Sequence, residues 1–235
     1  LQAGWLHVSG VLAAGMLAVV WGAHWLHLQA VRRTHHCELL HCAATAGAVD
    51  GDAEFAAFIN KLQTTICDEV AAMDGSGRTF GVDRWERDPS NPAAGYGVTR
   101  VLEDGNLIEK GAVNVSIIQG VLTPQRAQSM SSRGRSINPA GGDPYKAAAL
   151  SLVLHPRSPL IPTLRADVRV FEVAGAKWYG GGCDLTPVYL NEEDACEFHA
   201  HWKEVCDAHH PDYYPQFKKW CDEYFYIPAR KEHRG

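Results

Sequence analysis

Apolar residues recur at every third or fourth position between residues 52 and 73, a spacing that predicts an amphipathic helix. The repeat is made of Phe55, Phe58, Ile59, Leu62, Ile66 and Val70. Asp52 stands where a helix N-cap is expected, and Asp74-Gly75-Ser76-Gly77 is a turn sequence that ends the pattern. The helix has one apolar face, which the rest of the chain must cover.

Shorter segments with alternating or continuous apolar residues come next, and these predict strands. Residues 97–103 and 106–110 flank Asp104-Gly105 and predict a hairpin, and further strands are expected over 113–118, 147–155 and 168–173. Helical patterns cover 192–209 and 213–226, and a helix starts near Pro124. We therefore expect an α+β fold in which helices flank a broad antiparallel sheet.

The first 31 residues contain no Asp, Glu, Lys or Arg. Trp5 and Trp25 lie twenty residues apart, about 30 Å along a helix, and Arg32 and Arg33 follow as a basic flank. This pattern predicts a transmembrane or membrane-embedded helix over 1–33 and a linker over 34–51. A buried helix and a retained targeting segment are the alternatives.

Composition excludes several classes of function. The formal net charge of -5 offers no basic face for a nucleic acid. The seven cysteines are scattered without CxxC pairs, which argues against a structural zinc site and against a disulfide framework. We therefore expect neither a nucleic-acid partner nor a resident metal.

Nine unusual strings stand in one order along residues 52–235, and together they resemble the oxygen-dependent coproporphyrinogen III oxidase family. A single such string would be a moderate signal, but nine in order make the resemblance specific. They are FGVDRW (80–85), TRVLEDG (99–105), EK (109–110), VNVS (113–116), SLVLHP (151–156), PT (162–163), RVFE (169–172), GGGCDLTP (180–187) and YPQFKKWCD (214–222).

This resemblance implies a broad antiparallel sheet sandwiched by helices, in a homodimer. It also implies an oxidative decarboxylation, in which two propionates of coproporphyrinogen III become vinyl groups and protoporphyrinogen IX forms. Molecular oxygen is the oxidant, and the family needs no flavin or haem cofactor.

The resemblance also implies roles for individual residues. Asp184 falls at a catalytic position that holds the pyrrole N–H groups, and Ser151, Arg169 and Arg234 fall at substrate-binding positions. The residue types suit these roles, because a carboxylate accepts hydrogen bonds from N–H donors and a guanidinium forms a planar fork for a propionate. A turn cap at Asp184 and an ion pair at a strand edge for Arg169 are the alternatives.

The chain departs from the family where proton transfer is expected. The pattern PTxHxNxR is here Pro162-Thr-Leu-Arg-Ala-Asp-Val-Arg169, so Arg165 replaces a proton-donating histidine and Asp167 replaces a substrate-binding asparagine. A guanidinium stays charged at working pH and does not exchange a proton there, so Arg165 is expected to be inactive in that role.

Some members of the family have four metal-associated histidines. His155 and His199 stand at two of these positions, but Arg165 and Ala229 occupy the others. Half of a ligand set binds a metal weakly at best, and we therefore predict no metal here.

Three functions remain open. The loss of the histidine, the apolar N-terminal run and the expectation that family domains continue beyond Gly235 favour a catalytically degenerate accessory subunit. It would contact lipid and other subunits in a thylakoid or mitochondrial inner membrane complex. The first alternative is an active coproporphyrinogen III oxidase, since Ser151, Arg169 and Asp184 are retained. The second is a porphyrin- or pigment-binding module without turnover.

Overall fold

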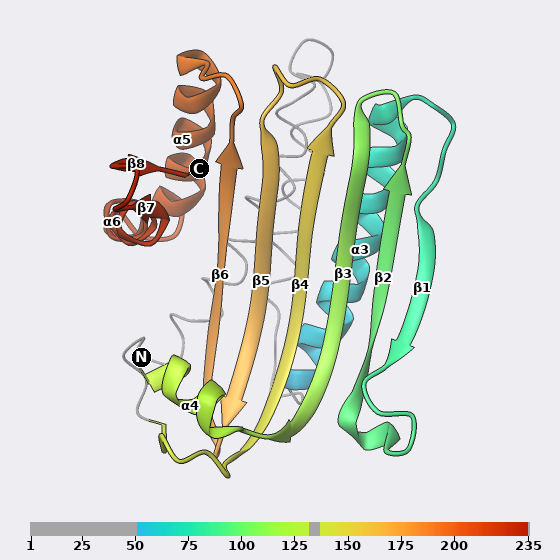
Figure 1. Ribbon diagram of the computed structural model, residues 1–235, viewed down its shortest axis with the longest axis vertical. Coiled ribbons are helices and arrows are strands. Elements are labelled where there is room, and N and C mark those ends of the chain that lie inside the picture. The colour runs from blue at the N-terminus through green and yellow to red at the C-terminus, as the bar shows by residue number, and fades with distance from the viewer. Residues whose placement is uncertain (1–50, 132–136, 235) are drawn as a thin grey trace.

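The computed structural model describes residues 51–131 and 137–234 (Figure 1). Six antiparallel strands lie side by side in chain order in one sheet. They are β1 (Gly81–Glu86), β2 (Gly95–Glu103), β3 (Ile108–Val121), β4 (Pro144–Pro156), β5 (Thr163–Val173) and β6 (Ala176–Thr186). The expected α+β class and the broad antiparallel sheet are confirmed for the described residues.

Helices lie on both sides of this sheet, and two very short strands pair near the end of the described chain. The helices are α3 (Gly51–Asp74), α4 (Pro124–Ser131), α5 (Glu192–Asp207) and α6 (Tyr213–Phe225), with a 3₁₀ turn η1 at Pro92–Ala94. The short strands are β7 (Tyr226–Ile227) and β8 (Glu232–His233).

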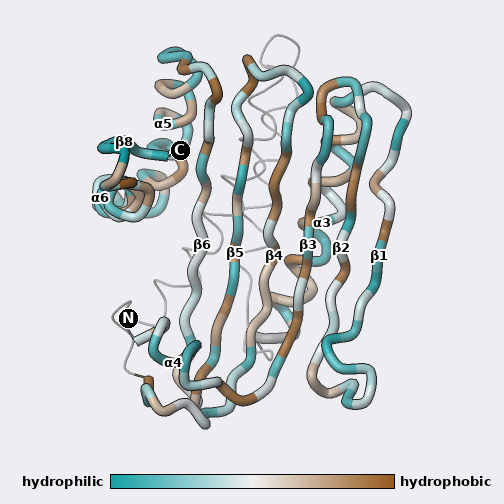
Figure 2. The backbone as a smooth tube through the Cα atoms, in the orientation of Figure 1, coloured by the Kyte–Doolittle hydropathy of each residue, from teal (hydrophilic) through white to brown (hydrophobic). Residues whose placement is uncertain are grey.

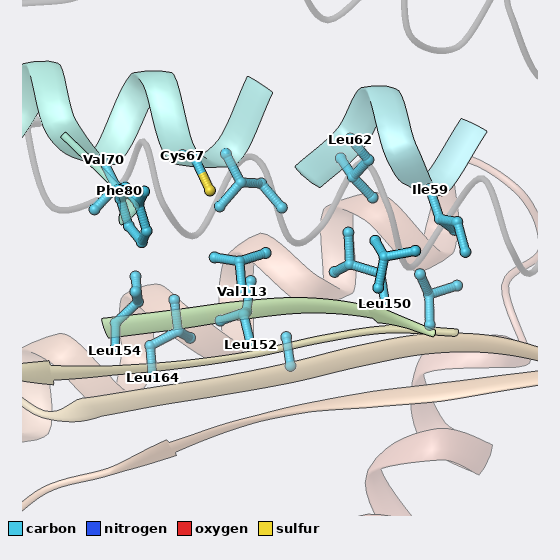
Figure 3. Packing of buried hydrophobic residues seen from close by; sticks show 14 of the residues in the cluster. Ile59, Leu62, Cys67, Val70, Phe80, Val113, Leu150, Leu152, Leu154 and Leu164 are labelled. Carbon is cyan, nitrogen blue, oxygen red and sulfur yellow. The ribbon is translucent and has the colours of Figure 1, made fainter. Parts of the chain in front are cut away.

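The core lies between α3 and one face of the sheet. Ile59 and Leu62 of α3 are fully or almost fully buried and point toward the sheet, which contributes Val113 and Leu150 (Figure 3). Ile66 is fully buried in the same core. Burying side chains of this size stabilises the fold by about 1.5–3 kcal/mol each. The 3.6-residue repeat therefore predicted the correct face of the helix.

The two faces of the sheet differ in character because side chains alternate along each strand. Figure 2 shows hydrophobic and hydrophilic residues alternating along β5, and in β4 buried and more exposed residues alternate over much of the strand. Trp202 of α5 joins the core on the α3 side, whereas Ala127 of α4 packs with Tyr145, Ala147 and Val173 on the opposite face. We call this opposite face, which α4 covers only at one end, the open face.

Asp74, the last residue of α3, fixes the turn between β2 and β3. Its carboxylate accepts hydrogen bonds from the backbone N–H groups of Asn106, Leu107 and Ile108 at 2.8–3.0 Å. Burial raises the pKa of this carboxyl, but hydrogen bonds from Ser76 and from the turn outweigh burial and hold the pKa at about 2. The helix and the hairpin are thereby joined through one side chain.

Several predicted boundaries were wrong. The helix begins at Gly51, so Asp52 lies inside it rather than at its N-cap. The two strands predicted over 106–110 and 113–118 are one long strand, which begins only at Ile108. Asp184 lies within strand β6 and not at a turn cap, and Arg169 lies on β5, a central strand rather than an edge strand. The expected membrane helix over 1–33 and nearly all of the linker lie outside the described residues. Among the helices that are described, none is long and apolar enough to cross a bilayer.

Candidate active site on the open face

The strand register brings the predicted site residues to the open face. Leu150, Leu152, Ala166 and Val168 are buried in the core, so the residues that alternate with them point the other way. The residues on the open face include Ser151 on β4, Arg165, Asp167 and Arg169 on β5, and Asp184 on β6. Residues far apart in sequence thus share one face of three neighbouring strands.

Arg165 and Asp184 lie directly opposite each other on β5 and β6. The guanidinium Nη1 is 3.5 Å from the carboxylate Oδ2, and the side chains are 46% and 3% exposed respectively. Arg165 therefore pairs across the two strands with a carboxylate that is almost completely buried.

Asp184 has two further polar neighbours. Thr186 donates its hydroxyl to Oδ1 at 3.2 Å, and Arg234 places Nη2 3.9 Å from the same oxygen. Arg234 follows β8, and its backbone N–H donates to the carbonyl oxygen of Phe225 at the end of α6. The chain end of the described region is thereby held beside β6, which brings the Arg234 side chain next to Asp184, and its substrate-binding role stays a prediction.

Asp167 forms an ion pair with Arg169, two residues along the same strand. Burial raises the pKa of the Asp167 carboxyl, although the neighbouring Arg169 and Arg165 guanidiniums oppose this effect. Ser151 lies opposite Asp167 on β4 and is exposed. Beside them on β6, a Cβ added at Gly182 would meet no atom within 4 Å, so there is open space at this level of the sheet.

The two residual histidines are not brought into this cluster. His155 is exposed near the end of β4, opposite Lys110. His199 on α5 shares a 3.2 Å hydrogen bond with Tyr214 of α6, and burial together with Lys218 lowers its pKa. The residues that the structure describes contain no group of three side chains able to hold a metal ion. The expected absence of a metal stays a prediction.

In chemical terms, the site combines two buried carboxylates with three partly exposed guanidiniums. Guanidiniums that reach solvent from a rigid sheet suit a ligand with several carboxylates. A carboxylate at the floor suits N–H donors of the same ligand. Thr186 was not predicted, and nor was a role for Asn114 on the same face. The strict alternation of side chains along each strand was the signal that could have placed both.

Comparison with known proteins assigns the family. The family model described as coproporphyrinogen III oxidase matches residues 54–235. The chain belongs to the coproporphyrinogen III oxidase family. The cluster around Asp184 lies within the residues that the family model matches.

Individual relatives support the assignment. The chain is 46% identical to the oxygen-dependent coproporphyrinogen-III oxidase of Drosophila melanogaster over 182 residues, which cover 75% of this chain and 46% of that protein. It is 46% identical to the mitochondrial enzyme of Homo sapiens, covering 75% of this chain and 39% of that protein. It is 43% identical to coproporphyrinogen-III oxidase 1, chloroplastic, of Arabidopsis thaliana, covering 78% of this chain and 48% of that protein. The chain thus spans less than half the length of these three relatives.

Proposed function

We propose that this protein is an oxygen-dependent coproporphyrinogen III oxidase and that the open face of its sheet binds the substrate. The observation that carries this proposal is the pairing of the buried Asp184 with Arg165 and Arg234, next to the Asp167–Arg169 ion pair on the same face. Neither the described residues nor the relatives point to an accessory subunit of a membrane complex, so the enzyme is the function we favour.

In this proposal Asp184 accepts hydrogen bonds from pyrrole N–H groups while the guanidiniums bind propionates. Arg165 and Arg234 neutralise Asp184 when the substrate is absent, and their partly exposed side chains are free to turn toward propionate oxygens when it binds. The exchange replaces one set of charge-assisted hydrogen bonds with another, so the buried Asp184 carboxylate keeps hydrogen-bond donors when the substrate binds.

The reaction balances with molecular oxygen as the only oxidant. Each propionate loses CO₂ and one β-hydrogen as it becomes a vinyl group, which is a two-electron oxidation. Oxygen accepts the two electrons and is reduced to hydrogen peroxide, with the net uptake of one proton. The site residues position the propionate, and the protein contributes no redox group in this scheme.

The relatives named as mitochondrial or chloroplastic suggest that this protein also acts in an organelle. The proposal that the chain lies in or on a membrane rests on residues 1–33 and stays a prediction.

A binding experiment tests the site. Coproporphyrinogen III is titrated anaerobically, so that no oxidant is present, and binding is followed by quenching of tryptophan fluorescence. Gly182→Val should weaken binding at least tenfold, because the new side chain projects into the open space beside Asp167, where its Cβ would meet no described atom within 4 Å. Gly81→Val, at the far edge of the sheet on β1, is the matched control and should bind as the unmodified protein does. Equal affinity in both variants would place the substrate elsewhere.

A further inference from the structure

Polar side chains face one another across five strands at a single level of the open face. Asp83, Thr99, Asn114, Ser151 and Asp167 are successive cross-strand partners from β1 to β5. Directly opposite residues in a sheet have Cβ atoms about 4.5–5.5 Å apart, so neighbours in this row are within reach of one another. The row runs toward the candidate active site from the opposite edge of the sheet.

The hydrogen bonds in this row have a fixed direction. The Trp85 indole Nε1–H donates to Thr99 Oγ1 at 3.2 Å, and an indole has no acceptor. The Thr99 hydroxyl hydrogen is therefore free to donate to Asn114 Oδ1, which lies 2.7 Å away. Because the carbonyl end of the Asn114 amide is bound to Thr99, its NH₂ end must point away from Thr99.

The position of Trp85 is itself fixed by the sheet. Its ring lies over Gly97, where an added Cβ would stand 2.0 Å from a ring carbon. Only glycine leaves room for the indole to reach across β2 to Thr99. Trp85, Gly97 and Thr99 therefore form a rigid support that sets the orientation of the Asn114 amide.

Two donors remain beside this support. Within the described residues, no hydrogen bond uses the Asn114 amide nitrogen or the Ser151 hydroxyl, although Ser151 is exposed and Asn114 is partly exposed. The two residues are direct partners on β3 and β4. Neighbouring N–H and O–H donors on an accessible surface suit a carboxylate, which accepts at both oxygens.

We propose that Asn114 binds a substrate carboxylate together with Ser151, and that Trp85 and Thr99 are the positioning residues that orient its amide. This inference rests on the proposed function, because the ligand is a propionate of the tetrapyrrole. Asn114 is three strands from Asp184, or about 14 Å across the sheet. A ring held above Asp184 would therefore present a propionate arm, rather than a pyrrole N–H, to Asn114.

Anaerobic titration with coproporphyrinogen III tests the proposal. Asn114→Asp keeps an oxygen for Thr99 but replaces the NH₂ donor with a negative charge, so the dissociation constant should rise about tenfold to a hundredfold. Asn91→Asp makes the same change of charge on an exposed loop residue, whose side chain caps nothing, and should leave binding unchanged.

A second pair of variants separates orientation from folding. Thr99→Val removes the hydroxyl that fixes the amide and should weaken binding about threefold to tenfold, whereas Thr99→Ser keeps the hydroxyl and should restore it. The melting temperatures of all variants are measured in parallel, and binding is compared well below them. In steady-state turnover, Thr99→Val should raise KM and leave kcat nearly unchanged.

The outcomes are distinguishable. If the unmodified protein binds no coproporphyrinogen III, both the proposed function and this inference fail. If it binds, but Asn114→Asp and Asn91→Asp bind equally well, the role of Asn114 is refuted and the proposed function stands. If Thr99→Val and Thr99→Ser bind alike, the orienting role of Thr99 is refuted.

Discussion

Arg165 and Asp184 form a cross-strand ion pair between β5 and β6, with Nη1 and Oδ2 3.5 Å apart. The arginine occupies the position where the family resemblance implies a proton-donating histidine. The substitution therefore neutralises the carboxylate of the site with a group that does not exchange protons at working pH. Substitutions at Arg165 and Asp184 should therefore change substrate binding and turnover in different ways.

Asp184→Asn tests the carboxylate. The amide is isosteric but neutral, and its NH₂ group faces the pyrrole donors, so anaerobic binding of coproporphyrinogen III should weaken about tenfold to a hundredfold. Asp212→Asn is a suitable control, because Asp212 is highly exposed at the start of α6 and does not cap the helix. Unchanged affinity in Asp184→Asn would show that this carboxylate does not bind the substrate.

Arg165→His tests the missing proton donor. Arg165 is nearly half exposed, so the fold should tolerate the change. An imidazole can act as a general acid, and kcat should rise at least tenfold, with a new limb in the pH–rate profile near pH 6.5. Arg165→Lys keeps the positive charge without a group that titrates near neutrality, and it should give no increase. An increase in kcat in both Arg165→His and Arg165→Lys, or in neither of them, would contradict a proton-transfer role for this position.

Asp167→Asn tests the second carboxylate. Burial raises the pKa of the Asp167 carboxyl in the folded protein, so the ionised carboxylate destabilises the fold relative to the protonated form. The stability that the protonated form contributes is fully present below the unfolded pKa of 3.8 and is lost as the pH rises through the folded pKa. The amide variant should therefore be more stable than the unmodified protein at pH 7, and the difference should shrink toward pH 4. Removing a negative charge beside the propionates should also tighten binding, by about threefold to tenfold. Thermal unfolding at both pH values measures the first effect, and a variant that is less stable at pH 7 would refute it.

Asp74→Ala tests the junction of α3 with the β2–β3 turn. Losing three backbone hydrogen bonds to a carboxylate should lower the free energy of unfolding by about 2–4 kcal/mol, measured by urea denaturation. The stability that the Asp74 carboxylate contributes is present above its unfolded pKa of 3.8 and is lost as the pH falls to about 2. The difference in free energy of unfolding between the unmodified protein and Asp74→Ala should therefore narrow over that range.

The stability of Asp74→Ala is compared with that of two further variants. Asp68→Ala, on the exposed side of the same helix, should change stability little. Gly105→Ala should destabilise, because its Cβ would stand 2.4 Å from Asp74 Oδ1. Equal stability of Asp74→Ala and Asp68→Ala would show that the turn does not depend on this carboxylate.

The sequence predicted the core helix and much of the sheet because both depend on local periodicity. The repeat along α3 and the alternation along β5 each identify a buried face without knowledge of any partner, and the nearly continuous apolar run over 147–154 predicts the strand β4. Gln63 gave no such signal. It interrupts the apolar stripe, yet it is buried because its amide donates to the carbonyl oxygens of Val98 and Val113 at 2.7 and 2.9 Å.

The pairing within the site was not predictable from local pattern. It depends on the register of β5 and β6, which the two-residue turn at Ala174 and Gly175 sets. Both turn residues have positive φ, 49° and 83°, as the tight hairpin requires. Ala-Gly is a weaker hairpin signal than Asn-Gly, and the three glycines at 180–182 lower the strand propensity of β6. The sequence therefore predicted no strand over 176–186 and did not place Asp184 opposite Arg165.

The most direct measurement of the central claim is aerobic turnover of coproporphyrinogen III by the purified, folded protein. Protoporphyrin fluorescence is followed after oxidation of the product, and a reaction without protein gives the spontaneous background. We predict product above this background, formed with consumption of oxygen and lost in Asp184→Asn. A protein that binds coproporphyrinogen III but forms no product would contradict the proposed oxidase and would favour a binding module without turnover.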